Sequence, residues 1–199
     1  MKQPAGVILA GGLARRMGGG DKGLLRLGDK SILQHVVDRL GPQVSGLALN
    51  ANGEAERFAG FGLPVIADSV EGFAGPLAGV LAGLDWAAEK GADHIVTAAA
   101  DTPFFPADLV PRLMLALEGG SKIALARTKD GRHPTFGLWP VSLREDLRQE
   151  LIAGTRKVVA WTDKHGTGYA DFPALGFDPF FNVNTPDDLA KAQVLMERA

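Results

Sequence analysis

Short apolar segments alternate with longer amphipathic segments along almost the whole chain, and this alternation limits the possible folds. Most of the apolar segments are nearly continuous, which is typical of strands that are covered on both faces. The expected strands are 5–10, 46–50, 63–68, 94–101, 122–127, 135–140 and 180–184. Strand–helix alternation of this kind predicts an α/β fold with a mostly parallel sheet between layers of helices.

Helical periodicity follows most of these segments. In 31–41, Ser31 can cap the helix, apolar residues recur every three or four positions, and Gly41 and Pro42 end it. The other expected helices are 76–90, 106–119, 142–154 and 185–198. Because no linker or repeat interrupts the pattern, we expect residues 1–199 to form a single domain, a Rossmann-like three-layer sandwich. The part from 128 to 178 is the least regular.

The charge balance and the lack of cysteine argue against several classes of function. The 199 residues carry a formal net charge of −2, whereas nucleic acids and anionic membranes need a cationic surface. The sequence contains no cysteine, which excludes disulfides, thiolate metal sites and a cysteine nucleophile. The apolar run 7–10 is too short for a signal peptide, and no stretch is long enough to span a membrane. We therefore expect a cytoplasmic protein without nucleic-acid or membrane partners.

A glycine-rich stretch, LAGGLARRMGGGDKG (9–23), follows the first expected strand. Ligands of open parallel sheets bind outside the carboxyl ends of the strands. Gly11 and Gly12 would let backbone N–H groups approach a phosphate closely, while Arg16 and Lys22 supply positive charge. This combination at a strand end indicates a phosphate-binding loop.

Two better-known phosphate motifs do not describe this stretch. Residues 18–23 formally match G-x-G-x-x-G, but the match begins well after the expected strand end and opens no helix there. The Walker A pattern requires Ser or Thr after its lysine, whereas Gly23 follows Lys22. A dinucleotide-dependent oxidoreductase is therefore disfavoured. For residues 18–20 taken alone, a solvated surface loop is the simpler interpretation.

Three polar residues end other expected strands. Asp101 follows an apolar run, and a carboxylate at the ligand edge of a sheet suits Mg²⁺, which keeps phosphate oxygens and waters as its other ligands. Asp101 could equally cap the turn before Pro103 or the helix that follows it. Asp68 and Asn50 could likewise be turn residues.

The glycine-rich stretch resembles the signature loop of the small-molecule nucleotidyltransferases, in particular the molybdenum cofactor guanylyltransferase family. The family pattern has an L-A-G-G turn, an R-M-G-G segment and a D-K step, and all three stand here without a gap. Further matches follow in the family's order, namely LNAN (49–52), GPLAG (75–79), DTPF (101–104), HPT (133–135) and NVNTPDDL (182–189). The resemblance covers nearly the whole chain.

This resemblance implies that GMP is transferred from GTP to the terminal phosphate of molybdopterin, with Mg²⁺ as cofactor and pyrophosphate as the second product. It implies a nucleotide-binding N-terminal half, with the base near GPLAG, and a pterin-binding C-terminal half. The residues implied for GTP are Leu9, Ala10, Gly11, Gly12, Lys22, Asn50, Asp68 and Asp101. The residues implied for the pterin are Arg156, Asn182 and Asn184. The implied catalytic residues are Lys22, Asp101 and Arg16, of which Asp101 is the metal ligand.

Several alternatives remain open at this level. A related transferase that uses CTP would share the loop, although HPTFGLWP (133–140) and NVNTPDDL favour guanine. A non-catalytic nucleotide-binding module would not need both Lys22 and Asp101. Some related transferases carry a second metal-binding aspartate near the position of Asn184, so a second carboxylate ligand is in doubt. A lone histidine such as His133 is more often structural than catalytic. A protein that delivers or accepts the cofactor is a further candidate partner.

Overall fold

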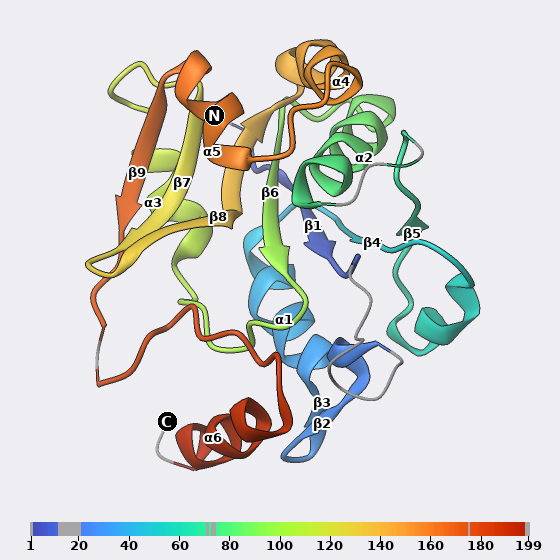
Figure 1. Cartoon of the computed structure of the whole chain (residues 1–199), viewed down its shortest axis with the longest axis vertical. Helices are drawn as coiled ribbons and strands as arrows, with labels where there is room; N and C mark the ends of the chain where they lie inside the picture. The colour runs from blue at the N-terminus through green and yellow to red at the C-terminus, as the bar shows by residue number, and fades with distance from the viewer. Residues whose placement is uncertain (1, 12–20, 71, 73–74, 175, 198–199) are drawn as a thin grey trace.

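A seven-stranded sheet with the order β5-β4-β1-β6-β8-β7-β9 runs through the molecule (Figure 1). The structure is a computed structural model and describes residues 2–11, 21–70, 72, 75–174 and 176–197. The strands of this sheet are β1 (Ala5–Leu9), β4 (Leu47–Asn50), β5 (Val65–Ile66), β6 (His94–Ala99), β7 (Ile123–Thr128), β8 (Gly131–Pro140) and β9 (Thr167–Asp171). Strand β8 is antiparallel to both of its neighbours, and every other pair in the sheet is parallel. The predicted mostly parallel sheet is thus confirmed.

Helices cover both faces of the sheet. The α-helices are α1 (Ile32–Leu40), α2 (Pro76–Glu89), α3 (Leu109–Leu115), α4 (Arg144–Ile152), α5 (Val158–Thr162) and α6 (Pro186–Met196). Short 3-10 helices connect them, namely η2 (Lys22–Leu24), η3 (Gly41–Gln43), η4 (Ala55–Phe61), η5 (Val141–Leu143) and η6 (Asp163–His165). Among the described residues, no helix is both long enough and apolar enough to cross a bilayer.

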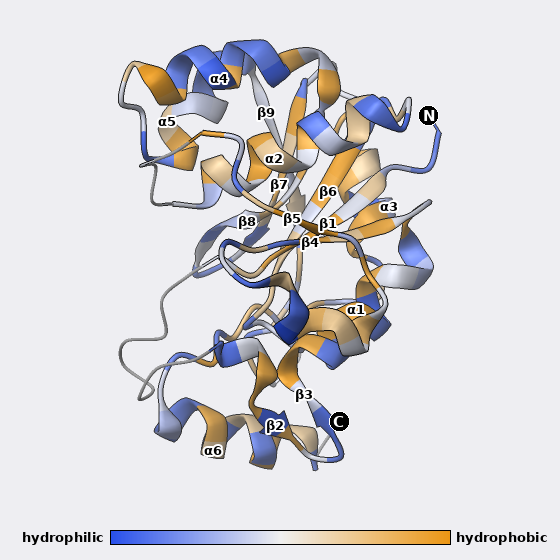
Figure 2. Cartoon of the chain, turned by 90° about the vertical axis from the view of Figure 1, so that its right-hand side faces the viewer, coloured by the Kyte–Doolittle hydropathy of each residue, from blue (hydrophilic) through white to orange (hydrophobic). Residues whose placement is uncertain are grey.

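Two apolar layers hold the helices against the sheet. On one face, α1 and α3 pack with side chains such as Ile8 and Val96. On the other face, α2, α4 and α5 pack with the intervening residues of the same strands, such as Val7 and Ile95. Figure 2 shows apolar strands inside the molecule and a polar outer helix α4. The continuous apolar strands of the sequence are therefore explained by burial on both faces, and the three-layer α/β fold is confirmed.

A third apolar cluster lies apart from the sheet, where α6 packs on a small hairpin. Strands β2 (Arg26–Leu27) and β3 (Lys30–Ser31) form this hairpin. Its Leu27 packs with Val183 and Ala192, which lie before and within α6. A capping box begins α6, because the Thr185 hydroxyl accepts from the Asp188 N–H while the Asp188 carboxylate accepts from the Thr185 N–H. This cluster joins the end of the chain to the segment that follows the glycine-rich loop.

Some of the expected elements differ in the structure, and some elements were not predicted. Residues 180–184 form no strand, because Val183 donates its N–H to the Asp101 carbonyl (2.8 Å) outside any ladder. The helix expected at 106–119 is only Leu109–Leu115, since turns flank it on both sides. Strand β9 and helix α5 fall in the least regular part and were missed. Strand β9 is short and contains a glycine, so it lacks the usual signal for a strand.

A packing constraint at β9 yields a stability prediction. A Cβ added at Gly168 would collide with the carbonyl oxygen of Ala116, a backbone atom at the end of α3. We expect Gly168→Ala to lower the free energy of unfolding by about 1–3 kcal/mol, which denaturant unfolding measures. Gly46→Ala is the matched control, because its new Cβ meets nothing within 4 Å. Equal stability of the two variants would contradict this account of β9.

Candidate functional site

The polar strand ends of the sequence meet beside the end of β1, the point where the chain changes direction across the sheet. Strand β4 lies on one side of β1 and β6 on the other. Helix α1, which lies between β1 and β4 in the sequence, covers one face of the sheet, and helix α2, which precedes β6, covers the other. Leu9 pairs with both Asn50 and Ala99. Ala10 donates its N–H to the Asn50 carbonyl (2.8 Å), and Ala100 donates its N–H to the Leu9 carbonyl (3.1 Å). Crevices at such switch points are the usual ligand sites of open α/β sheets.

A cavity of about 60 Å³ opens at this point. It is lined by residues 9–11 and 21–23 and by Leu33, Phe58, Ala100 and Asp101. Of the predicted phosphate-site residues, Leu9, Ala10, Gly11, Lys22 and Asp101 are therefore brought together. Gly12 and Arg16, which the sequence also predicts here, lie outside the described residues.

The carboxylate of Asp101 is partly buried beside a positive charge. Burial raises the pKa of Asp101, and this effect is opposed by the Lys22 ammonium and by the Thr102 hydroxyl. The Thr102 hydroxyl lies 3.2 Å from Asp101 Oδ1. A bound cation would favour the charged carboxylate further. Among the described residues, no group of three or more His, Asp or Glu side chains could hold a metal. A single carboxylate still fits Mg²⁺, because this ion commonly takes one or two carboxylates together with substrate phosphates.

The segment before α6 forms hydrogen bonds with residues that line the cavity or lie next to them. Lys22 Nζ donates to Asn184 Oδ1 (2.7 Å). The Thr102 hydroxyl, which is fully buried, donates to Asn182 Oδ1 (2.6 Å). Val183, between the two asparagines, bonds to the backbone of Asp101. Residues 182–184, predicted from the family motif, thus contact the Lys22 side chain, the backbone of Asp101 and the neighbouring Thr102.

A second polar cluster lies at the ends of β4 and β5. The buried Asn50 amide donates to Asp68 Oδ1 (3.0 Å). Asn52 makes two contacts with Asp68, because its amide donates to Oδ2 (2.8 Å) and its carbonyl oxygen accepts the Asp68 N–H (2.9 Å). Asn50 and Asp68 were predicted to lie at the site. Asn52 was not among the residues predicted for the site, although it belongs to the LNAN motif (49–52) and follows Asn50 by two positions.

The start of α2 approaches this cluster closely. A Cβ added at Gly79 would collide with Asn50 Oδ1 and lie 2.8 Å from Leu9 Cδ2, so only glycine fits there. The GPLAG segment therefore lies at the same edge of the sheet as the predicted nucleotide residues. Arg156 lies beside it, since its carbonyl oxygen is 3.9 Å from a Cβ added at Gly75. Arg156 is exposed at this edge.

The His133 side chain contacts other side chains of the protein. Its ring stacks on Phe180 with a centroid distance of 4.2 Å, and its Nε2 lies 3.0 Å from the Thr128 hydroxyl. Burial lowers the pKa of His133, so the neutral ring is favoured. The stacked, neutral ring fits the structural interpretation of this histidine.

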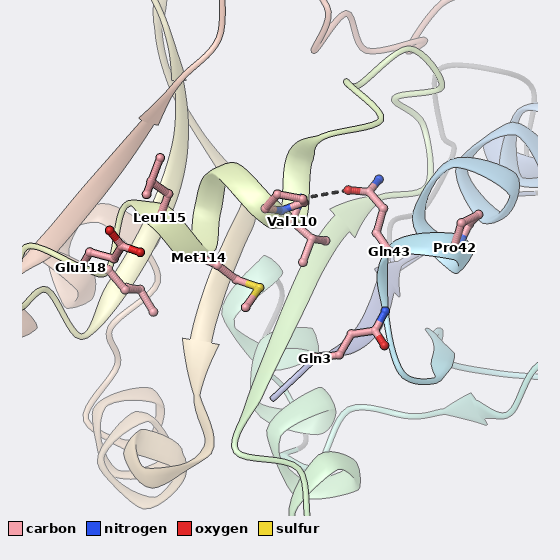
Figure 3. A pocket seen from close by; sticks show the side chains of 9 residues that line it. Gln3, Pro42, Gln43, Val110, Met114, Leu115 and Glu118 are labelled. Carbon is pink, nitrogen blue, oxygen red and sulfur yellow. Dashed lines mark hydrogen bonds between the residues drawn. The ribbon is translucent and has the colours of Figure 1, made fainter. Parts of the chain in front are cut away.

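A larger hollow of about 830 Å³ lies far from these residues (Figure 3). It is lined by parts of α3 and η3 and by Gln3, which precedes β1, so it is at the amino ends of the strands. Figure 3 shows Gln43 accepting a hydrogen bond from the Val110 N–H on its wall. Its lining is mainly apolar, and the predicted site residues are not part of it. This hollow therefore lies at the opposite edge of the sheet from the predicted site residues.

Comparisons with known proteins agree with the geometry. Residues 6–167 match the family model of the MobA-like NTP transferase domain. A molybdenum cofactor guanylyltransferase of Mesorhizobium japonicum is 53% identical over 199 residues, which cover 97% of this chain and 96% of the relative. One of Rhodopseudomonas palustris is 54% identical over 191 residues, which cover 94% and 91%. The crystal structure of molybdopterin-guanine dinucleotide biosynthesis protein A from Archaeoglobus fulgidus superposes with a TM-score of 0.77 at 25% identity, covering 98% of this chain and 100% of that one.

The contact between Thr102 and Asn182 can be tested by itself. Thr102→Val removes the buried hydroxyl with little change of shape, and we expect the free energy of unfolding to fall by about 1–3 kcal/mol. Amide hydrogen exchange at 182–184 should rise in the variant. Thr162→Val is the matched control, because that buried hydroxyl donates to the Val159 carbonyl in its own helix (3.3 Å) and to no other group in the described part of the chain. Unchanged exchange at 182–184 in Thr102→Val would show that this hydrogen bond does not hold the segment.

Proposed function

The chain belongs to the family of MobA-like NTP transferase domains and is a nucleotidyltransferase, and from this premise we propose that it transfers GMP from GTP to the terminal phosphate of molybdopterin. Pyrophosphate is the second product. The observation that carries the proposal is the meeting of the end of β1, Lys22 and Asp101 around one cavity. Backbone N–H groups, an ammonium and a carboxylate that suits Mg²⁺ are the groups that a bound triphosphate requires.

The chemistry needs alignment and charge stabilisation more than proton transfer. An oxygen of the pterin's terminal phosphate attacks the α-phosphorus of GTP, and the bond to the bridging oxygen breaks as pyrophosphate leaves. Because the nucleophile is already an anion, no general base is required. Positioning two reactants and stabilising developing charge account for most of the rate in such reactions.

The predicted phosphate-site residues have separate roles in this proposal. Backbone groups of residues 9–12 would hold the triphosphate, and Lys22 would stabilise charge on the leaving pyrophosphate. Arg16 is proposed for the same task from its sequence position. Asp101 would hold Mg²⁺, which when bound supplies neutralisation of charge on the phosphate oxygens.

The cluster around Asp68 favours guanine over cytosine. Guanine presents two adjacent donors, its N1–H and its exocyclic amine, which a carboxylate can accept together. Cytosine presents one donor beside the acceptor N3, which would face the carboxylate unfavourably. Asn50 and Asn52 orient Asp68 and leave lone pairs free on its oxygens. We therefore propose that Asp68 contacts the base near the start of α2.

The C-terminal half would hold the second substrate. Asn182 and Asn184 contact the surroundings of Asp101 and Lys22, so a phosphate bound beside them would lie near the proposed α-phosphate position. Arg156 is exposed at the same edge of the sheet, where its guanidinium suits a phosphate. We propose these three residues for the pterin substrate.

Calorimetric titration with GTP, CTP, ATP and UTP, each with Mg²⁺, tests the choice of nucleotide. We expect GTP to bind at least about tenfold more tightly than the other three, since a base edge left unpaired at Asp68 costs about 1–3 kcal/mol. Preference for CTP would keep the fold and the chemistry but assign the chain to cytidylyl transfer. Absence of binding by all four nucleotides would contradict the proposed function.

Turnover of the catalytic variants tests the mechanism. Lys22→Ala and Asp101→Ala should each lower kcat by about 100-fold or more, because each removes charge stabilisation from the reacting phosphates. Chelation of the divalent metal should abolish turnover of the wild-type protein. Lys30→Ala and Asp38→Ala are matched controls, since these residues form an exposed ion pair on the hairpin and α1. Wild-type turnover in either catalytic variant would remove that residue from the mechanism.

A further inference from the structure

Arg57 in η4 joins the two polar parts of the site. Its Nε lies 2.5 Å from Asp21 Oδ2, in the last part of the glycine-rich stretch, directly before Lys22. Its Nη2 donates to the Asn52 carbonyl (2.6 Å), and its Nη1 donates to the Glu54 carbonyl (2.7 Å). One guanidinium thus contacts the residue before Lys22 and the segment that carries Asn50 and Asn52.

Most contacts of the guanidinium come from residues that are close to Arg57 in the sequence. Both carbonyl contacts come from residues within five positions of Arg57, and the group lies 4.6 Å from the centroid of the buried Phe58 ring. Among the described residues, the buried Nε has no directed hydrogen bond, so its contact with Asp21 is an ion pair. Arg57 is therefore the fixed partner, and Asp21 is the residue whose position depends on the pair.

Asp21 lies where an unpaired negative charge would oppose phosphate binding. It lines the cavity together with Lys22 and Asp101. Its carbonyl accepts the Leu24 N–H (3.0 Å) and so begins η2, the short helix whose first residue is Lys22. A free carboxylate at this position would repel a triphosphate and compete with it for the Lys22 ammonium.

We infer that Arg57 is a positioning residue that neutralises Asp21 and keeps its carboxylate from the triphosphate and from Lys22. This inference rests on the proposed nucleotide site and adds a residue to it. Arg57 acts through Asp21 and does not need to touch the substrate. The two outer phosphates of GTP should feel the effect most, because they are proposed to lie at Lys22.

Nucleotide binding in single and double variants tests this role. Arg57→Ala should weaken GTP binding by about tenfold, while GMP, which lacks the two outer phosphates, should change by less than about threefold. Adding Asp21→Asn should restore most of the GTP affinity, because the unpaired carboxylate is then gone. Arg57→Gln, which removes the charge but keeps part of the stem and an amide donor, should reproduce the loss if the alanine variant does not fold.

Arg112→Ala is the matched control, because Arg112 also contacts a carboxylate (Asp108, 2.6 Å), a carbonyl (Asp171, 3.1 Å) and an aromatic ring, but on α3. It should leave the affinities for GTP and GMP unchanged. Equal losses for GTP and GMP in Arg57→Ala, or no recovery in the double variant, would overturn the inference. If the wild-type protein prefers CTP, the same comparison with CTP and CMP applies, and only the proposed base is wrong. If it binds no nucleotide, the proposed function fails and the inference fails with it.

Discussion

Two backbone hydrogen bonds, from Ala10 to Asn50 and from Ala100 to Leu9, hold the ends of three parallel strands at one level. After β1 the chain continues to one face of the sheet, and the helix before β6 covers the other face. A crevice forms between such connections at the carboxyl ends of the strands. Asn50, the start of the glycine-rich stretch and Asp101 lie at the same edge of the sheet because β4, β1 and β6 end together. The position of every other group in the proposed site depends on this register.

Charge in the crevice is balanced locally. Two carboxylates, Asp21 and Asp101, line a cavity that is proposed to hold a highly anionic substrate. Each has a different counter-charge, since Arg57 pairs with Asp21 while Lys22 acts on Asp101. Burial raises the pKa of Asp101, because surroundings of low polarity disfavour the charged carboxylate. A divalent cation bound at Asp101, as proposed, would offset this cost together with the Lys22 ammonium.

Much of the fold and of this crevice could be predicted from the sequence because both depend on local patterns. Continuous apolar segments predicted the buried strands, and residues at their ends predicted the contents of the cavity. The contribution of Arg57 could not be predicted, because its contact with Asp21 joins segments that have no pattern in common. Strand β9 was missed for a similar reason: it is short and contains Gly168, and its place is set by close packing on α3. Residues 180–184 were predicted as a strand because they include apolar residues, and Phe180 and Val183 are indeed buried. Their backbone joins no sheet, and the Val183 N–H bonds to the Asp101 carbonyl instead.

Residues 182–184, near the C-terminus, contact site residues that come much earlier in the sequence. Asn184 bonds to Lys22 across 162 positions of sequence, and Asn182 bonds to Thr102 across 80. These contacts depend on the third apolar cluster, where Val183 and α6 pack on the hairpin that follows Lys22. The same cluster therefore sets the position of residues 182–184 and of the chain that carries Lys22. Packing of α6, although it lies outside the sheet, thereby determines how the two proposed substrate regions face each other.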